Sequence, residues 1–156
     1  MNQSDTPVRD RIFASLVYLL PLFDGLVFGA FIFKQLNLGS VFAILLGIYR
    51  SLPFQPFTNL ILFFVFLFAI VRNSNISHFI RFNTMQAVLL DVILLLCGLV
   101  LDILGTGLQG GLITETLYNT VFLGIVAASG YAIFESLRGR YGEIPAISDA
   151  VHMQVR

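Results

Sequence analysis

The stretch FNTMQAVLLDVILLLCGLVLDIL, residues 82–104, decides the fold class of this chain. A helix needs about 20 mostly apolar residues to cross the ~30 Å hydrocarbon core of a bilayer, and this stretch is long enough. Its acidic residues are Asp91 and Asp102, and it contains no Lys or Arg. The stretch therefore predicts a membrane-spanning helix.

The composition of the whole chain agrees with a membrane location. Of the 156 residues, 57% are hydrophobic and 12% are charged, whereas an ordinary soluble domain has roughly 25% charged residues. A domain of this size cannot bury so many apolar side chains in one core. The formal net charge is zero, which argues against binding to nucleic acid through its phosphates.

The residues that usually carry metal or catalytic chemistry are scarce. The chain has one cysteine, Cys97, and two histidines, His78 and His152. These are too few and too far apart in the sequence for a thiolate cluster or a zinc site. We therefore expect no metal, no cofactor and no enzymatic activity.

Three further stretches are candidate membrane spans, and they cover residues 12–33, 57–71 and 112–134. The stretch 57–71 is roughly 22 Å long as a helix, so it requires local thinning of the bilayer. Residues 41–49 are too few to span and predict a short interfacial or re-entrant helix. We expect an all-α membrane protein with four transmembrane helices and this extra short helix, in a single domain over residues 1–156.

The basic residues predict the orientation of the four spans. The N-terminus, the loop between the second and third spans, and the C-terminus then lie on one side. Seven of the nine basic residues fall there: Arg9, Arg11, Arg72, Arg81, Arg138, Arg140 and Arg156. Lys34 and Arg50 fall on the other side. The positive-inside rule places both termini in the cytoplasm or its equivalent, and a fifth span at 41–49 would weaken this asymmetry.

Two acidic residues fall near the middle of predicted spans. Asp24 lies roughly 20 Å beyond Arg11 along a helix, and Asp91 roughly 15 Å beyond Arg81. A charge at this depth costs about 2.5 kcal/mol or more, so each Asp is protonated, hydrogen-bonded or exposed to water. They line a passage or relay protons in one interpretation. In the other, Asp24 ends a half-helix at the membrane surface and Asp91 forms a hydrogen bond that only fixes helix packing.

Two helix faces carry further candidate residues. A polar stripe on one face of the stretch 82–104 consists of Thr84, Asp91, Gly98 and Asp102. These positions share a face at helical periodicity, and we expect that face to contact the bundle or a partner. Small residues four positions apart in the stretch 112–134 predict close helix packing, and they are Gly124, Ala128 and Ala132.

The sequence RFNTMQA at residues 81–87, together with YLLPLFDG at residues 18–25, resembles the signature of the Tic20 family. The matching motif residues are Arg81, Phe82, Asn83, Met85 and Gln86, and Thr84 stands where many members have Ala. The order of spans and the length resemble the family along nearly the whole chain. Asn83 and Gln86 either anchor the start of the third span by bonding to neighbouring helices and loops, or contact a substrate.

The resemblance implies a four-helix membrane protein of cyanobacteria or plastids. In plastids, Tic20 is a component of the inner-envelope translocon that imports preproteins, and it is proposed to line the protein-conducting path. The implied partners are membrane lipids, other translocon subunits and a translocating polypeptide, in a homo- or hetero-oligomer. The absence of a transit peptide favours a cyanobacterial plasma or thylakoid membrane, or a plastid-encoded member in the inner envelope.

Two alternatives to a translocon subunit stay open from the residues. One is a small ion- or proton-coupled transporter that uses Asp24 and Asp91. The other is a structural scaffold of a membrane complex.

Overall fold

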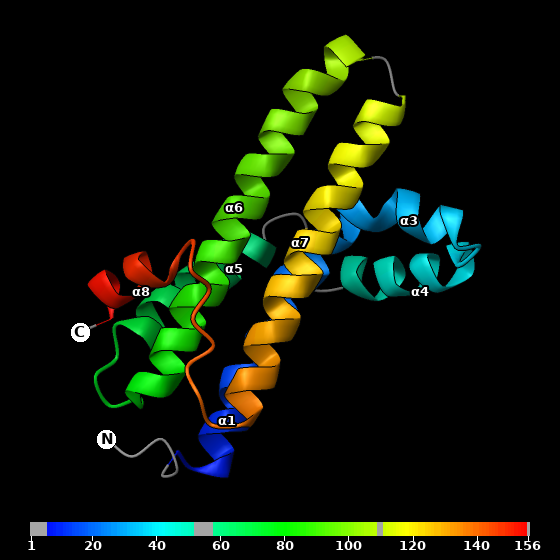
Figure 1. The fold of residues 1–156 in the computed structure, drawn as a ribbon. Coiled ribbons are helices and arrows are strands. Elements are labelled where there is room, and N and C mark those ends of the chain that lie inside the picture. Colours follow the sequence, from blue (N-terminus) through cyan, green and yellow to red (C-terminus); the bar gives the residue numbers. More distant parts are fainter. Residues whose placement is uncertain (1–5, 52–57, 109–110, 156) are drawn as a thin grey trace.

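The computed structural model describes residues 6–51, 58–108 and 111–155, and within these ranges it contains helices and loops but no strand (Figure 1). Three helical stretches are long and apolar enough to cross a membrane: Val8–Gln35, His78–Gly105 and Leu112–Leu137. Two shorter apolar helices cover Gly39–Arg50 and Thr58–Val71. The expected all-α architecture with membrane-length helices is confirmed. The expected second span appears as the shorter helix Thr58–Val71, and residue 57 lies outside the described ranges.

The two longest helices, α6 (His78–Leu108) and α7 (Leu112–Leu137), run side by side in opposite directions (Figure 1). The ends near their connection stand clear of the other helices in Figure 1. Large apolar side chains are exposed there, among them Leu99, Leu112 and Ile113. Lipid or a partner protein must cover this apolar surface.

The first membrane-length stretch is a chain of short helices. Its parts are α1 (Val8–Leu16), α2 (Leu19–Gly25), the 3-10 helix η1 (Leu26–Gly29) and α3 (Ala30–Gln35). Pro21 explains the first break, because a proline ring clashes with the carbonyl four residues earlier, here that of Val17. Pro21 itself lies in the first turn of α2, where its missing N–H removes no hydrogen bond.

Two glycines bring this first stretch close to α7. A Cβ atom on Gly25 would lie 2.7 Å from Cγ2 of Ile125, and one on Gly29 would lie 2.9 Å from Cε2 of Phe122. Both distances are too short for a real side chain. The close approach of this part of the first stretch to α7 therefore depends on glycine.

A tight turn reverses the chain between α3 and α4 (Gly39–Arg50). Asn37 adopts a φ of 55°, a conformation that Asn tolerates better than most residues, and the backbone N–H of Leu38 donates to the carbonyl of Phe33 over 2.8 Å. The two helices lie side by side and point away from the α6–α7 pair (Figure 1). The short helix expected at residues 41–49 is thus present as α4.

The remaining elements gather around the start of α6. Helix α5 (Thr58–Val65) continues into the wider π-helical segment η2 (Phe66–Val71), which packs against α6. After α7, Gly139 has a φ of 74°, and the N–H of Arg140 donates to the carbonyl of Glu135 over 2.9 Å. This is the usual glycine-dependent helix end. The chain then returns to α6 and ends in α8 (Ser148–Gln154).

Candidate functional site

The family-motif side chains at the start of α6 point into the protein. Four of them have no exposed surface: Phe82, Asn83, Thr84 and Gln86. Met85 is 6% exposed and, with Phe82, joins an apolar cluster that includes Val71 of η2 and Val151 of α8. The guanidinium Nε of Arg81 donates to the carbonyl of Val71 over 2.7 Å. The motif therefore holds three segments of the chain together.

A buried polar hub forms around the two motif amides, and we define it as Tyr18, Asn83, Gln86 and Ser136 with the backbone of Gly142 and Ile144. The Tyr18 hydroxyl donates to Oδ1 of Asn83 over 2.9 Å, and Nε2 of Gln86 donates to the Tyr18 oxygen over 2.8 Å. The Ser136 hydroxyl of α7 donates to the same Asn83 oxygen over 2.8 Å. Hydrogen bonds are strong in a buried environment of low dielectric constant, and a polar group left unpaired there would destabilise the fold.

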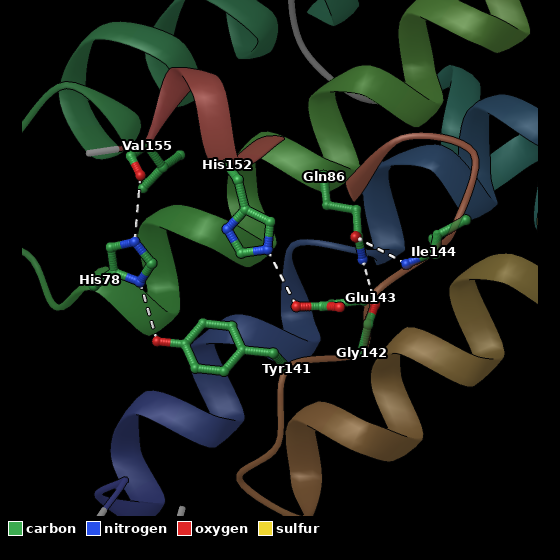
Figure 2. Close-up of polar contacts among 8 residues, drawn as sticks. All are labelled: His78, Gln86, Tyr141, Gly142, Glu143, Ile144, His152 and Val155. Carbon is green, nitrogen blue, oxygen red and sulfur yellow. Dashed lines mark hydrogen bonds and ion pairs between the residues drawn. The ribbon is translucent and has the colours of Figure 1, made fainter. Parts of the chain in front are cut away.

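The C-terminal segment completes the polar hub. Nε2 of Gln86 also donates to the carbonyl of Gly142 over 2.8 Å, and the N–H of Ile144 donates to Oε1 of Gln86 over 3.4 Å (Figure 2). The Gln86 amide thus pairs with the segment after α7 through both its nitrogen and its oxygen. This pairing ties the chain after α7 to the start of α6.

A second set of polar contacts holds the C-terminal segment from outside (Figure 2). Nδ1 of His78 lies 3.0 Å from the Tyr141 hydroxyl, and Nε2 of His78 lies 3.3 Å from the carbonyl of Val155. Nε2 of His152 lies 3.1 Å from Oε1 of Glu143. Both histidines therefore connect parts of the same C-terminal segment to each other or to α6.

A separate polar region is a cavity of about 590 Å³ lined by residues from α2, η1, α4, α5 and α6. Its polar lining residues are Asp24, Tyr49, Asn59 and Asp91, and its remaining lining residues are apolar. We call it the acidic cavity. The two Asp residues, which the sequence places in different spans, thus share one cavity.

The acidic cavity has one internal chain of hydrogen bonds. The Tyr49 hydroxyl donates to Oδ1 of Asp24 over 2.8 Å, and Nδ2 of Asn59 donates to the Tyr49 oxygen over 2.7 Å. Burial raises the pKa of Tyr49 to about 12, so this hydroxyl keeps its proton at neutral pH. Oδ1 of Asp91 and Oδ1 of Asn59 are buried and have no hydrogen-bond partner within residues 6–51, 58–108 and 111–155.

The residues of the predicted polar stripe lie in different surroundings. Thr84 is fully buried and its hydroxyl has no hydrogen-bond partner in the described part of the chain, whereas Asp91 lines the acidic cavity. A Cβ atom on Gly98 would lie 3.7 Å from Phe28, and Asp102 is exposed on the far half of α6. The structure therefore brings Asp91 together with Asp24 but leaves Asp102 apart.

The three small residues of α7 also differ in their surroundings. Gly124 is exposed, with open space where a Cβ atom would lie. Ala128 is half-buried, and Ala132 is fully buried against Gly142 of the C-terminal segment. The tight helix contact on α7 is instead made by Ile125 and Phe122.

The structure places five further residues in the polar hub or the acidic cavity, and the sequence predicts no contact for them. They are Tyr18, Tyr49, Asn59, Ser136 and Gly142. A signal exists for Tyr18 and Ser136, since a polar group within an apolar helix needs a hydrogen-bond partner. No such signal exists for Gly142, which contributes only a backbone carbonyl. Tyr49 and Asn59 have partners that only the reversal of the chain at α4 brings near.

Apolar helices of membrane length around a buried polar hub define a polytopic integral membrane protein. In the described ranges, no group of three or more His, Cys, Asp or Glu side chains is placed to hold a metal ion. A family model described as "Chloroplast import apparatus Tic20-like" matches residues 7–151. The chain belongs to the Tic20 family.

Relatives from cyanobacteria, plants and red algae are similar over almost the whole chain. A "Tic20 family protein" of Synechocystis is 46% identical over 159 residues, which cover 99% of this chain and 98% of the relative. "Protein TIC 20-II, chloroplastic" of Arabidopsis thaliana is 35% identical over 99% of this chain and 76% of its own length. "Tic20 family protein Ycf60" of Porphyra purpurea is 29% identical over 99% of this chain and 79% of its own length.

Proposed function

We propose that this chain is a non-enzymatic membrane subunit of a protein translocon and contributes to a protein-conducting path. The observation that carries the proposal is the family match across residues 7–151, because the family description connects it with the chloroplast import apparatus. The membrane in question is a cyanobacterial plasma or thylakoid membrane, or a plastid inner envelope. These alternatives follow from the cyanobacterial and plastid relatives.

We propose that other copies or subunits complete this path. The acidic cavity, at about 590 Å³, has the size of a small-molecule pocket. That is too small for an extended polypeptide to pass through. The exposed apolar faces of α6 and α7, with Leu99 and Leu112, offer surface for subunits or lipid.

We also propose one domain with four spans at residues 12–33, 57–71, 82–104 and 112–134, and with both termini on the same side. The Thr6 hydroxyl donates to the carbonyl of Gly139 over 3.4 Å, so the start of α1 lies beside the end of α7. This contact supports a common side for the two ends of the chain.

Photocrosslinking in the native membrane tests the translocon proposal. A crosslinking amino acid at Leu99 is combined with a polypeptide arrested during translocation. We expect a crosslink that disappears when the polypeptide is released. An active translocation system without any such crosslink, from Leu99 or from a second exposed position such as Leu95, would contradict the proposal.

The two carboxyl groups of the acidic cavity favour a second candidate, a proton- or cation-coupled transporter. In that case Asp91→Asn abolishes a pH-dependent flux in proteoliposomes. A different result is expected if the protein is a structural scaffold. Loss of the protein then causes a larger complex to dissociate, while every transport activity of the membrane persists.

A further inference from the structure

The acidic cavity opens on an apolar, exposed surface of the protein. Its floor includes Phe28 and Leu94, which are buried, whereas Val27, Leu60 and Leu95 at its edge are 45%, 55% and 63% exposed. An exposed apolar surface on a membrane-length helix faces lipid or another membrane protein. The polar groups of the cavity are therefore reached from the lipid-facing side.

The acidic cavity has more hydrogen-bond acceptors than donors. The Tyr49 proton is used on Asp24, and the Asn59 amide donates to the Tyr49 oxygen. This leaves Oδ1 of Asn59 and Oδ1 of Asp91 buried, with no donor from the residues that the structure describes. Buried polar groups of native proteins are normally paired, and a carboxyl group in an apolar cavity is either protonated or paired with an opposite charge. A donor with a positive charge fits this cavity, because it can pair with an ionised Asp91 and also donate to the Asn59 oxygen.

The residues that the structure describes do not supply this group. The predicted spans 12–33, 57–71, 82–104 and 112–134 contain no Lys or Arg. Arg50 follows Tyr49 but is exposed, and no ion pair joins it to Asp24 or Asp91. The same predicted spans of a second copy of the chain also contain no Lys or Arg. The basic residue therefore comes from a different protein.

We propose that the acidic cavity docks a transmembrane helix of another protein, one that carries a Lys or Arg within its apolar stretch. The ammonium or guanidinium group of that residue supplies several donors to Asp91, Asn59 and Asp24. The apolar residues around it cover Val27, Leu60 and Leu95, which a free cation would leave exposed. The proposal rests on the cavity alone and holds whether or not the protein conducts polypeptides.

Reconstitution with defined peptides tests this docking. The full chain is placed in phosphatidylcholine vesicles with a fluorescent Leu/Ala transmembrane peptide that has one central Lys, and energy transfer reports association. The donor dye sits on Asn75→Cys in a Cys97→Ala background. We expect the Lys peptide to associate roughly tenfold more tightly than the same peptide with a central Leu.

Variants of the chain supply the controls. The advantage of the Lys peptide should disappear with Asp91→Asn and decrease with Asp24→Asn, and it should persist with Asp102→Asn, which removes an exposed acid from the same helix. Equal association of the Lys and Leu peptides with the unmodified chain would overturn the proposal without any variant. Self-association of the chain that Asp91→Asn abolishes would overturn it in favour of a second copy as the occupant.

Discussion

Tyr18 and Asn83 are 65 positions apart, and a buried hydrogen bond of 2.9 Å joins their side chains. The bond connects the first membrane-length stretch to the start of α6, and Ser136 of α7 donates to the same Asn83 oxygen. Neither Asn83 nor Gln86 has exposed surface. Their burial favours an anchoring role for these motif residues over direct contact with a substrate.

Replacing Gln86 should destabilise the protein strongly. Gln86→Leu leaves the carbonyl of Gly142 and the N–H of Ile144 without their side-chain partner. We expect a loss of roughly 2 kcal/mol or more, since each unpaired buried group costs about 1–3 kcal/mol. Thermal unfolding in detergent measures the change, with Gln154→Leu at an exposed position of α8 as the matched control. Equal unfolding temperatures for both variants would contradict the prediction that the polar hub stabilises the fold.

The two glycines of the first stretch should tolerate no side chain, unlike a glycine of α7. Gly29→Ala places a methyl group 2.9 Å from the ring of Phe122, and overpacking of this kind costs about 1–3 kcal/mol. Gly124→Ala meets open space within α7 and should not lower stability, since Ala favours a helix more than Gly does. Unfolding curves of the two variants in the same detergent measure their stabilities. A larger loss of stability for Gly124→Ala than for Gly29→Ala would contradict the prediction.

The C-terminal segment should detach when its apolar contact is weakened. Val151 has no exposed surface and packs with Phe82 and Met85. Val151→Ala removes buried methyl groups at a cost of about 2 kcal/mol. We expect faster proteolysis after residue 140 than in the unmodified chain. Met153→Ala, at a position that is 69% exposed, should be cleaved at the original rate.

The proposed topology predicts which single cysteines a membrane-impermeant reagent reaches. In a Cys97→Ala background, Asn75→Cys and Glu143→Cys should be labelled from the same side of the membrane. Ser40→Cys, at the start of α4, should be labelled from the opposite side. Labelling of Asn75→Cys and Ser40→Cys from one side would show that the helix between them, Thr58–Val71, does not cross.

The sequence predicts the helices better than it predicts their contacts. Apolar length alone indicates α6, α7 and the short α4, because membrane spanning imposes a minimum length. Apolar length does not show that the first stretch breaks after Leu16, four to five residues before Pro21, whose ring is incompatible with a continuous helix there. It also does not show that α4 reverses against α3, since that reversal depends on the backbone of Asn37.

In the candidate site too, the sequence predicts the acidic residues better than it predicts their partners. The cost of burying a carboxyl group marks Asp24 and Asp91 as residues that need partners, and the structure places both on one cavity. The partners themselves, Tyr49 and Asn59, come from segments whose position is set by tertiary packing. The small-residue pattern of α7 shows where close packing is possible, but the close contact uses glycines of the facing helix.

The polar hub sets an order for the synthesis and insertion of the chain. Its members extend from Tyr18 to Ile144, so it cannot be complete until nearly the whole chain has left the ribosome. Until then the Asn83 and Gln86 amides lack their last partners. In the proposed topology these amides lie near the membrane surface, where water can solvate them during this interval. A nascent chain that stops before Ile144 thus keeps the amide of Gln86 without its partners from the segment after α7.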